Sequence, residues 1–188
     1  ISFYPINQNE TITSWKDGNP GASSIFKNNG TYIYEKYVQY EISVSCNRLD
    51  TIMKKYKIPR VDIIWMDLQG AELLALKGLG KYLENVKYIH TEVSHKEIYF
   101  GQVMYDELNK FITSNNFILK NKLSMSGWQE DAIYYKASDK KNNLENKELF
   151  DIVICLGAKD KDIIYEQNIQ KKMLLDIEIY ILYHMNPI

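Results

Sequence analysis

One stretch constrains the fold more than any other part of the chain: Val61–Leu79, VDIIWMDLQGAELLALKGL. Its first part, Val61–Met66, is apolar apart from Asp62 and rich in β-branched residues, which is typical of a buried strand. The polar step Leu68-Gln69-Gly70 follows, and strong helix formers run from Ala71 to Lys77. The stretch therefore predicts a strand, a tight turn and a helix, the repeating element of an α/β sheet.

The end of this strand carries candidate site residues. In open α/β sheets, ligands bind outside the carboxyl ends of the strands, and Asp67 lies at such an end. Gly70 suits a sharp bend or a close approach to a ligand, because it has no Cβ. Glu72 falls in the first helical turn, where the helix dipole favours a negative charge. Asp67 and Glu72 either cap the helix or belong to a site, and their spacing leaves both interpretations open.

A second buried strand is predicted at Val86–Val93, with another acid, Glu92, near its end. If the two strands are parallel neighbours, Asp67 and Glu92 meet at one crevice. Like charges and burial would then raise at least one pKa and suit it to general-base work. His95, in the following loop, is a further catalytic candidate. A divalent cation would need a third well-placed ligand, so no metal site is predicted.

Weaker signals outline the other elements. The chain opens on a short strand with turn formers after it, and Tyr, Val and Ile in Thr31–Cys46 predict two extended segments. A helix is expected from about Arg48 until shortly before Pro59. The first helix after Gly70 is expected to reach about Leu83, and the remaining expectations are a helix at Tyr105–Ser114 and an antiparallel pair of strands at Phe117–Lys120 and Asp131–Lys136.

Composition excludes some classes of partner. A net charge of −1 over 188 residues gives no electrostatic footprint for nucleic acid or for an anionic membrane surface. No apolar run reaches the ~18 residues that a bilayer span requires. Cys46 and Cys155 lie in strand-like apolar runs, so we expect buried, reduced thiols and a cytoplasmic protein.

The motif DLQGAE at Asp67–Glu72, followed by LALKG, resembles the core of the FkbM-type methyltransferases. RLDTI at Arg48–Ile52 and IHTEV at Ile89–Val93 support the resemblance, which extends from residue 1 to about residue 136. The family has a class I fold that depends on S-adenosylmethionine. The resemblance therefore implies a Rossmann-like α/β sheet and methyl transfer to oxygen, often on a sugar or polyketide-like acceptor.

The resemblance also implies roles for individual residues and a small-molecule or glycan acceptor as partner. The predicted roles are catalytic for Asp67, Glu92 and His95, cofactor-binding for Gln69, Gly70 and Glu72, and acceptor-binding for Tyr99, Gln102 and Trp128. Those of His95 and Trp128 rest on their positions in loops rather than on the resemblance, and the alternative for Tyr99 and Trp128 is packing against the core.

One part of the family pattern is missing. No glycine loop of the acid-Val-Gly-Ala-Asn type precedes Val61, so we expect a sheet that is incomplete in its N-terminal half. Residues 137–148 are polar and predict a linker, and residues 149–188 predict an extra βαβ unit, with a strand at Leu149–Leu156 and a helix at Ile163–Leu175.

Two interpretations of this C-terminal unit stay open. It either begins a second domain, such as a glycosyltransferase in the same polypeptide, or docks beside the central strand and replaces the missing half, with Gly157 as the cofactor loop. An alternative from another class is a non-catalytic α/β module that forms homo-oligomers through open sheet edges.

Overall fold

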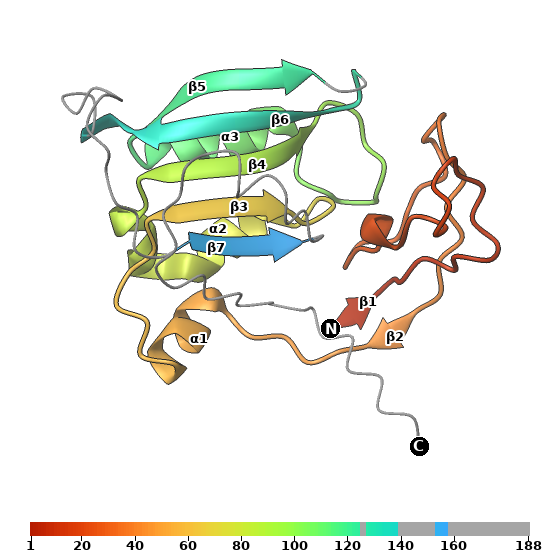
Figure 1. The fold of residues 1–188 in the computed structure, drawn as a ribbon, viewed down its shortest axis with the longest axis horizontal. Helices are drawn as coiled ribbons and strands as arrows, with labels where there is room; N and C mark the ends of the chain where they lie inside the picture. Colours follow the sequence, from red (N-terminus) through yellow and green to blue (C-terminus); the bar gives the residue numbers. More distant parts are fainter. Residues whose placement is uncertain (125–126, 139–152, 158–188) are drawn as a thin grey trace.

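The computed structural model describes residues 1–124, 127–138 and 153–157, which form an α/β architecture around one mixed sheet (Figure 1). The strand order is β5-β6-β4-β3-β7. β3, β4 and β7 are parallel, β6 is antiparallel to β4, and β5 is antiparallel to β6. The bounds are β3 Ile63–Asp67, β4 Tyr88–Ser94, β5 Phe117–Ser124, β6 Gln129–Lys136 and β7 Val153–Gly157.

Helices α2 (Glu72–Leu79) and α3 (Tyr105–Ser114) lie against one face of this sheet, behind the strands in Figure 1. Burial alternates along β3 and β4, as a strand's two-residue period requires, and Ile64, Met66 and Ile89 face the core. The shorter helix α1 (Leu49–Lys55) adds Leu49 and Met53 to the same core. The hydrophobic core is thus a layer between the sheet and its helices.

The predicted elements from α1 to β6 are confirmed, with shifted ends in α1, β3 and β4 and changes of length in α2, β5 and β6. α2 ends at Leu79 rather than near Leu83, because Gly80 takes a positive φ of 54° and a 3-10 turn, η2 (Gly80–Asn85), continues the chain. α3 has the predicted bounds. β5 and β6 are longer than predicted, since their antiparallel pairing runs from Phe117–Lys136 to Ser124–Glu130.

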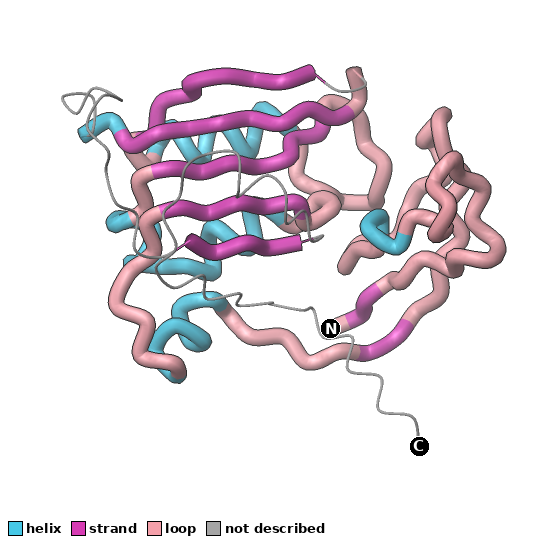
Figure 2. The backbone as a smooth tube through the Cα atoms, viewed as in Figure 1, coloured by secondary structure: helices cyan, strands magenta, loops and turns pink. Residues whose placement is uncertain are grey.

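The N-terminal segment, residues 1–46, lies beyond the carboxyl ends of β3 and β4 and is mostly irregular (Figure 2). It contains the strand pair β1 (Ser2–Phe3) and β2 (Ile42–Ser43) and a 3-10 turn, η1 (Pro20–Ala22). The prediction of two extended segments in Thr31–Cys46 is wrong in extent. Backbone groups there pair with scattered loop residues, as in the bridge of Ile12 with Lys36, so no long ladder forms.

Two further expectations concern the cysteines and the C-terminal unit. Cys46 is exposed rather than buried, because the apolar run that contains it belongs to the irregular segment. The strand expected at Leu149–Leu156 is observed as β7, whose residues pair with β3 from Val153 opposite Ile63 to Gly157 opposite Asp67. The helix expected at Ile163–Leu175 and most of the expected linker lie outside the described residues.

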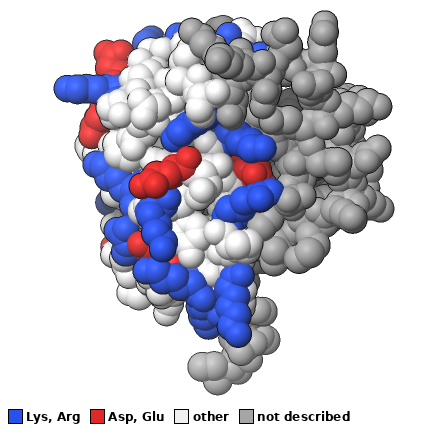
Figure 3. All heavy atoms as spheres, turned by 90° about the vertical axis from the view of Figure 1, so that its left-hand side faces the viewer, with Lys and Arg blue, Asp and Glu red and all other residues white. Residues whose placement is uncertain are grey.

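Charge is unevenly distributed over the molecule. Figure 3 shows the end where β3 and β4 begin, and Lys and Arg side chains gather there with few acidic ones between them. The carboxyl ends of the same strands carry Asp67 and Glu92. Among the described residues, no helix has both the length and the apolar character needed to cross a bilayer.

The core layer predicts a contrast within α2. Replacing Leu76, which is 1% exposed, with Ala should lower the free energy of unfolding by about 2–5 kcal/mol, because a cavity remains under the sheet. Leu74→Ala, in the same helix but 54% exposed, should change it by less than about 0.5 kcal/mol. Urea unfolding followed by circular dichroism measures both, and equal losses would contradict the assigned core face.

Candidate active site at the carboxyl ends of β3 and β4

A tight turn joins β3 to α2 and shapes this edge of the sheet. The backbone N–H of Ala71 donates to the carbonyl oxygen of Leu68 (3.3 Å). Gln69 (φ 49°) and Gly70 (φ 99°) are both left-handed, the combination that a type I′ turn requires at its two central positions. Glycine adopts this conformation readily, whereas glutamine does so only at a cost in energy.

Glu72 holds the turn from below. Its Oε1 accepts hydrogen bonds from the backbone N–H groups of Leu68 (2.8 Å) and Gly70 (3.3 Å). The side chain is 3% exposed, and this burial raises its pKa to about 7, against the opposing effect of the backbone donors. Glu72 therefore holds the turn that precedes α2, and among the described residues no side chain caps the N-terminus of that helix by a hydrogen bond.

Asp67 and Glu92 lie close together above the turn, and the side-chain amide of Gln69 lies between them. Gln69 Nε2 is 2.6 Å from Asp67 Oδ1 and 3.4 Å from Glu92 Oε2. Gln129 of β6 also donates to Glu92 Oε2, at 2.9 Å. The predicted meeting of the two acids is a consequence of the parallel pairing of β3 with β4.

The pair is electrostatically unfavourable for two negative charges. Burial, and then the charge of Asp131, raise the pKa of Asp67 to about 6, although the Gln69 amide lowers it. Burial, followed by the charges of Asp67 and Glu72, raises the pKa of Glu92 well above its ordinary value. Within the described part of the chain, neither acid forms an ion pair with Lys, Arg or His. The site can therefore take up a proton or a positive charge.

The N-terminal segment and the loop after β4 close over this pair. Ser24 Oγ donates to the carbonyl oxygen of Gln69 (2.8 Å). The buried Tyr99 hydroxyl lies 2.8 Å from the carbonyl oxygen of Ala22 and 3.0 Å from Gln69 Oε1. Gln102 holds the loop, since its Oε1 accepts the backbone N–H groups of Ile98 (2.8 Å) and Tyr99 (2.7 Å). One wall of the site is therefore assembled from distant parts of the sequence.

An aromatic cluster lines the same side. The Tyr37 ring stacks on Tyr99 with centroids 6.3 Å apart, and the Tyr32 ring meets both Tyr37 (5.7 Å) and Trp128 (5.5 Å). Burial raises the pKa of Tyr32, Tyr37 and Tyr99, and the charge of Glu92 adds to each shift. These phenols therefore remain protonated donors near the acids. Trp128 is only 8% exposed and packs within the cluster.

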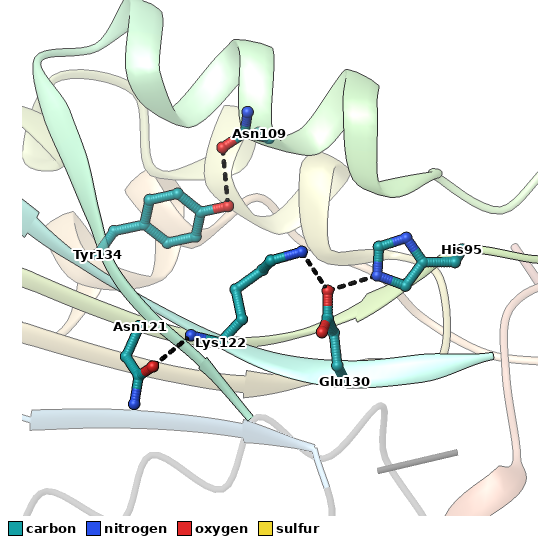
Figure 4. A network of polar contacts seen from close by, with 6 residues as sticks. All are labelled: His95, Asn109, Asn121, Lys122, Glu130 and Tyr134. Carbon is teal, nitrogen blue, oxygen red and sulfur yellow. Dashed lines mark hydrogen bonds and ion pairs between the residues drawn. The ribbon is translucent and has the colours of Figure 1, made fainter. Parts of the chain in front are cut away.

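His95 belongs to a separate network on the α3 side of the sheet (Figure 4). Its Nε2 lies 2.5 Å from Glu130 Oε1, which also accepts from Lys122 Nζ at 2.7 Å. The His95 ring lies 5.0 Å from the ring of Tyr105, the first residue of α3. Both neighbours lower the pKa of Glu130, Lys122 first. No hydrogen bond in the described chain links His95 to Asp67 or Glu92.

The structure thus divides the predicted site residues into groups. Those that converge at the edge are Asp67, Gln69, Glu92 and Tyr99; those that hold the turn and the loop are Gly70, Glu72 and Gln102; His95 joins Glu130, and Trp128 joins the aromatic cluster. Tyr32, Tyr37 and Gln129 were not predicted, and the dense tyrosines of Thr31–Cys46 were the only sequence signal for the first two. The described residues hold no group of three or more side chains that could ligate a metal ion.

Comparison with known proteins adds a family. Residues 1–119 match the family described as the methyltransferase FkbM domain. The 2-O-methyltransferase NoeI of Sinorhizobium fredii is 31% identical over 106 residues, which cover 55% of this chain and 42% of that relative. The match therefore spans less than half of the relative's length. No solved structure matches the chain significantly.

The turn predicts a difference between two glycines. Gly70→Ala should lower the free energy of unfolding by about 1–3 kcal/mol, because φ is positive and the new Cβ would clash with Cβ of Gln102. Gly101→Ala is the matched control: its φ of 77° imposes the same backbone strain, but nothing lies within 4 Å of the added Cβ. Denaturant unfolding should show the larger loss for Gly70, and equal losses would remove the clash from the explanation.

The buried Glu72 predicts a dependence of stability on pH. Because its pKa is about 7 in the folded chain and ordinary in the unfolded one, the folded state holds the proton more tightly. The contribution of this proton to the free energy of unfolding is fully present below the pKa of Glu72 in the unfolded chain, and it is lost as the pH rises through the folded pKa of about 7. Glu72→Gln keeps an acceptor for both N–H groups and removes the titration, so the loss between about pH 5 and pH 8 should shrink by on the order of 2 kcal/mol.

Urea unfolding of wild type and Glu72→Gln at the two pH values measures this change. Glu107→Gln, an exposed acid in the first turn of α3, is the control and should keep the wild-type pH profile. A Glu72→Gln profile identical to wild type would show that Glu72 is not the titrating group.

Proposed function

The chain belongs to the methyltransferase FkbM domain family, and from this premise we propose that it transfers the methyl group of S-adenosylmethionine to a hydroxyl oxygen of a saccharide or a similar small acceptor. The relative is named a 2-O-methyltransferase, which supports oxygen as the acceptor atom. The observation that carries the proposal is the partly buried pair Asp67 and Glu92 at the carboxyl edge of the sheet, bridged by Gln69 and lined by tyrosines. The alternative of a non-catalytic module is not favoured, because both comparisons point to methyltransferases.

The charge of the site supports the choice of methyl donor. S-adenosylmethionine carries a positive sulfonium and a positive ammonium group, and a desolvated carboxylate pair without a cationic partner favours such a ligand. Asp67, Gln69 and Glu92 would hold it near the reacting centre. Gly157 at the end of β7 lies opposite Asp67 in the sheet, where a residue without a side chain leaves room for close approach.

The polar and aromatic groups around the pair suit a polyhydroxylated acceptor. Sugars present hydroxyl groups at their edges and apolar C–H faces, so they need hydrogen-bonding side chains next to aromatic rings. Tyr32 and Tyr37 are partly exposed, provide both features, and lie near Glu92. Gln129 can bind a further hydroxyl with the amide that now contacts Glu92.

The carboxylates supply the proton chemistry. The bound donor would supply an electrophilic methyl group. An ionised Asp67 or Glu92 can accept the proton of the acceptor hydroxyl as that oxygen bonds to the methyl carbon, whose bond to the sulfonium sulfur would break to leave S-adenosylhomocysteine. A raised pKa makes the carboxylate a stronger base near neutral pH. Holding the hydroxyl and the base in fixed contact removes the entropic cost of bringing them together.

We propose in addition that the sheet is of the Rossmann-like class I type. The support is its set of parallel strands, with α2 and α3 following β3 and β4 on one face. β7 would then supply the strand that lies beside β3 at the cofactor, which is one of the two interpretations of the C-terminal unit.

Calorimetric titration with both forms of the donor tests the proposal. The folded chain should bind S-adenosylmethionine and S-adenosylhomocysteine. Asp67→Asn should weaken S-adenosylmethionine by about tenfold and S-adenosylhomocysteine by less, because only the former carries the sulfonium charge. Asp106→Asn, an exposed acid in the first turn of α3, should leave both affinities unchanged. Absence of binding by protein shown to be folded would contradict the proposal. If Asp67→Asn weakened both ligands equally, Asp67 would not be the group that contacts the sulfonium.

A further inference from the structure

Gln69 is held in a conformation that its own backbone disfavours. It is left-handed, with a φ of 49°, and it occupies the turn position where glycine or asparagine would fit without strain. A residue that keeps such a conformation is fixed by its surroundings. The contacts of Gln69 show which surroundings these are.

The amide of Gln69 uses both of its ends. Nε2 donates to Asp67 at 2.6 Å and lies 3.4 Å from Glu92, while Oε1 faces the Tyr99 hydroxyl at 3.0 Å. An ionised carboxylate only accepts hydrogen bonds, so the amino end must face Asp67 when Asp67 is charged, and the oxygen then faces the hydroxyl. The Gln69 side chain thus orients Asp67 at the end of β3 and at the same time contacts Tyr99 in the loop after β4.

The backbone of Gln69 extends this connection to the N-terminal segment. Its carbonyl oxygen accepts from Ser24 Oγ at 2.8 Å, and Ser24 Oγ also accepts the backbone N–H of Phe26 at 3.0 Å. The Tyr99 hydroxyl, 3.0 Å from Gln69 Oε1, also lies 2.8 Å from the carbonyl oxygen of Ala22. Residues 22–26 therefore contact Gln69 directly through Ser24, which is 1% exposed, and indirectly from Ala22 through Tyr99.

We infer that Gln69 is a positioning residue that couples the docking of residues 22–26 to the alignment of Asp67 and Glu92. Residues 22–26 form part of one wall of the site, so this part of the wall and the two acids take up their positions together. This inference rests on the proposed function only in treating the two acids as the reactive pair. It concerns only the contacts that Gln69 makes within the protein, and it does not depend on the donor contact proposed above for Gln69.

Gln69→Gly isolates the side chain, because glycine retains the left-handed turn and removes only the amide. Amide hydrogen exchange of residues 22–26 should speed up by about tenfold, because the Tyr99 hydroxyl, which contacts Ala22, loses its contact with Gln69 Oε1, whereas the bond of Ser24 to the backbone carbonyl at position 69 is kept. Asn116→Gly, the same replacement at another left-handed position (φ 64°), should leave exchange in residues 22–26 unchanged. The measurement needs neither donor nor acceptor, so its outcome is independent of whether the chain binds S-adenosylmethionine.

A second readout separates positioning from a merely structural role. The groups that face Asp67 are Gln69, Glu72, Glu92, Tyr99 and Asp131. Removing the only amide donor among them should raise the pKa of Asp67 in a carbon-13 carboxyl titration, and Ser24→Ala should shift the same titration although Ser24 touches neither acid. Together with faster exchange these shifts support the coupling. An unchanged Asp67 titration in Gln69→Gly, an unchanged one in Ser24→Ala, or unchanged exchange would each overturn it.

Discussion

The candidate site depends on the hydrogen bonds that the buried Glu72 carboxylate accepts from the turn between β3 and α2. This carboxylate satisfies the backbone N–H groups of Leu68 and Gly70, which a tight turn at the end of β3 would otherwise leave without partners. As the first residue of α2 it also lies at the positive end of the helix dipole. The turn, the start of the helix and the placement of Gln69 therefore share one acid.

This arrangement gathers negative charge where it is least stable. Glu72, Asp67 and Glu92 each have a raised pKa, mainly because burial disfavours the charged form. The charge of a neighbouring acid adds to each shift: Asp131 for Asp67, Asp67 for Glu72, and Asp67 first for Glu92. A fold selected for stability alone would place apolar groups there. The unfavourable charge is understandable if a cationic ligand completes the site, and the same burial that weakens the free protein then strengthens the attraction to that ligand.

Local patterns predicted the elements that local forces determine. The strand, turn and helix around Asp67 follow from β-branched residues, a glycine and helix formers in sequence, and α3 follows from its apolar spacing. The wall of the site did not follow in this way. Tyr32 and Tyr37 lie in a stretch with the composition of a strand, yet their ring partners include Tyr99 and Trp128, which no short-range pattern can identify.

The same reasoning explains why single residues were harder to place than elements. Trp128 was expected to bind the acceptor, and in the structure Tyr32 packs against its ring and Lys96 Nζ lies 4.6 Å from the ring centroid, so the indole is covered. The spacing of Glu72 suggested a helix cap or a site residue, whereas its carboxylate binds the backbone N–H groups of Leu68 and Gly70 in the preceding turn. Packing between distant segments decides such cases.

The site also extends beyond the part of the chain that carries the family match. Residues 1–119 include the turn, both acids and the N-terminal wall. β6 lies outside this range and donates Gln129 to Glu92, and β7 lies outside it and places Gly157 opposite Asp67. The matched region thus supplies Asp67, Glu72 and Glu92, while the strands that flank β3 and β4 on either side come from later in the chain. Because Glu92 takes one amide from each part, its geometry depends on the whole sheet rather than on the motif alone.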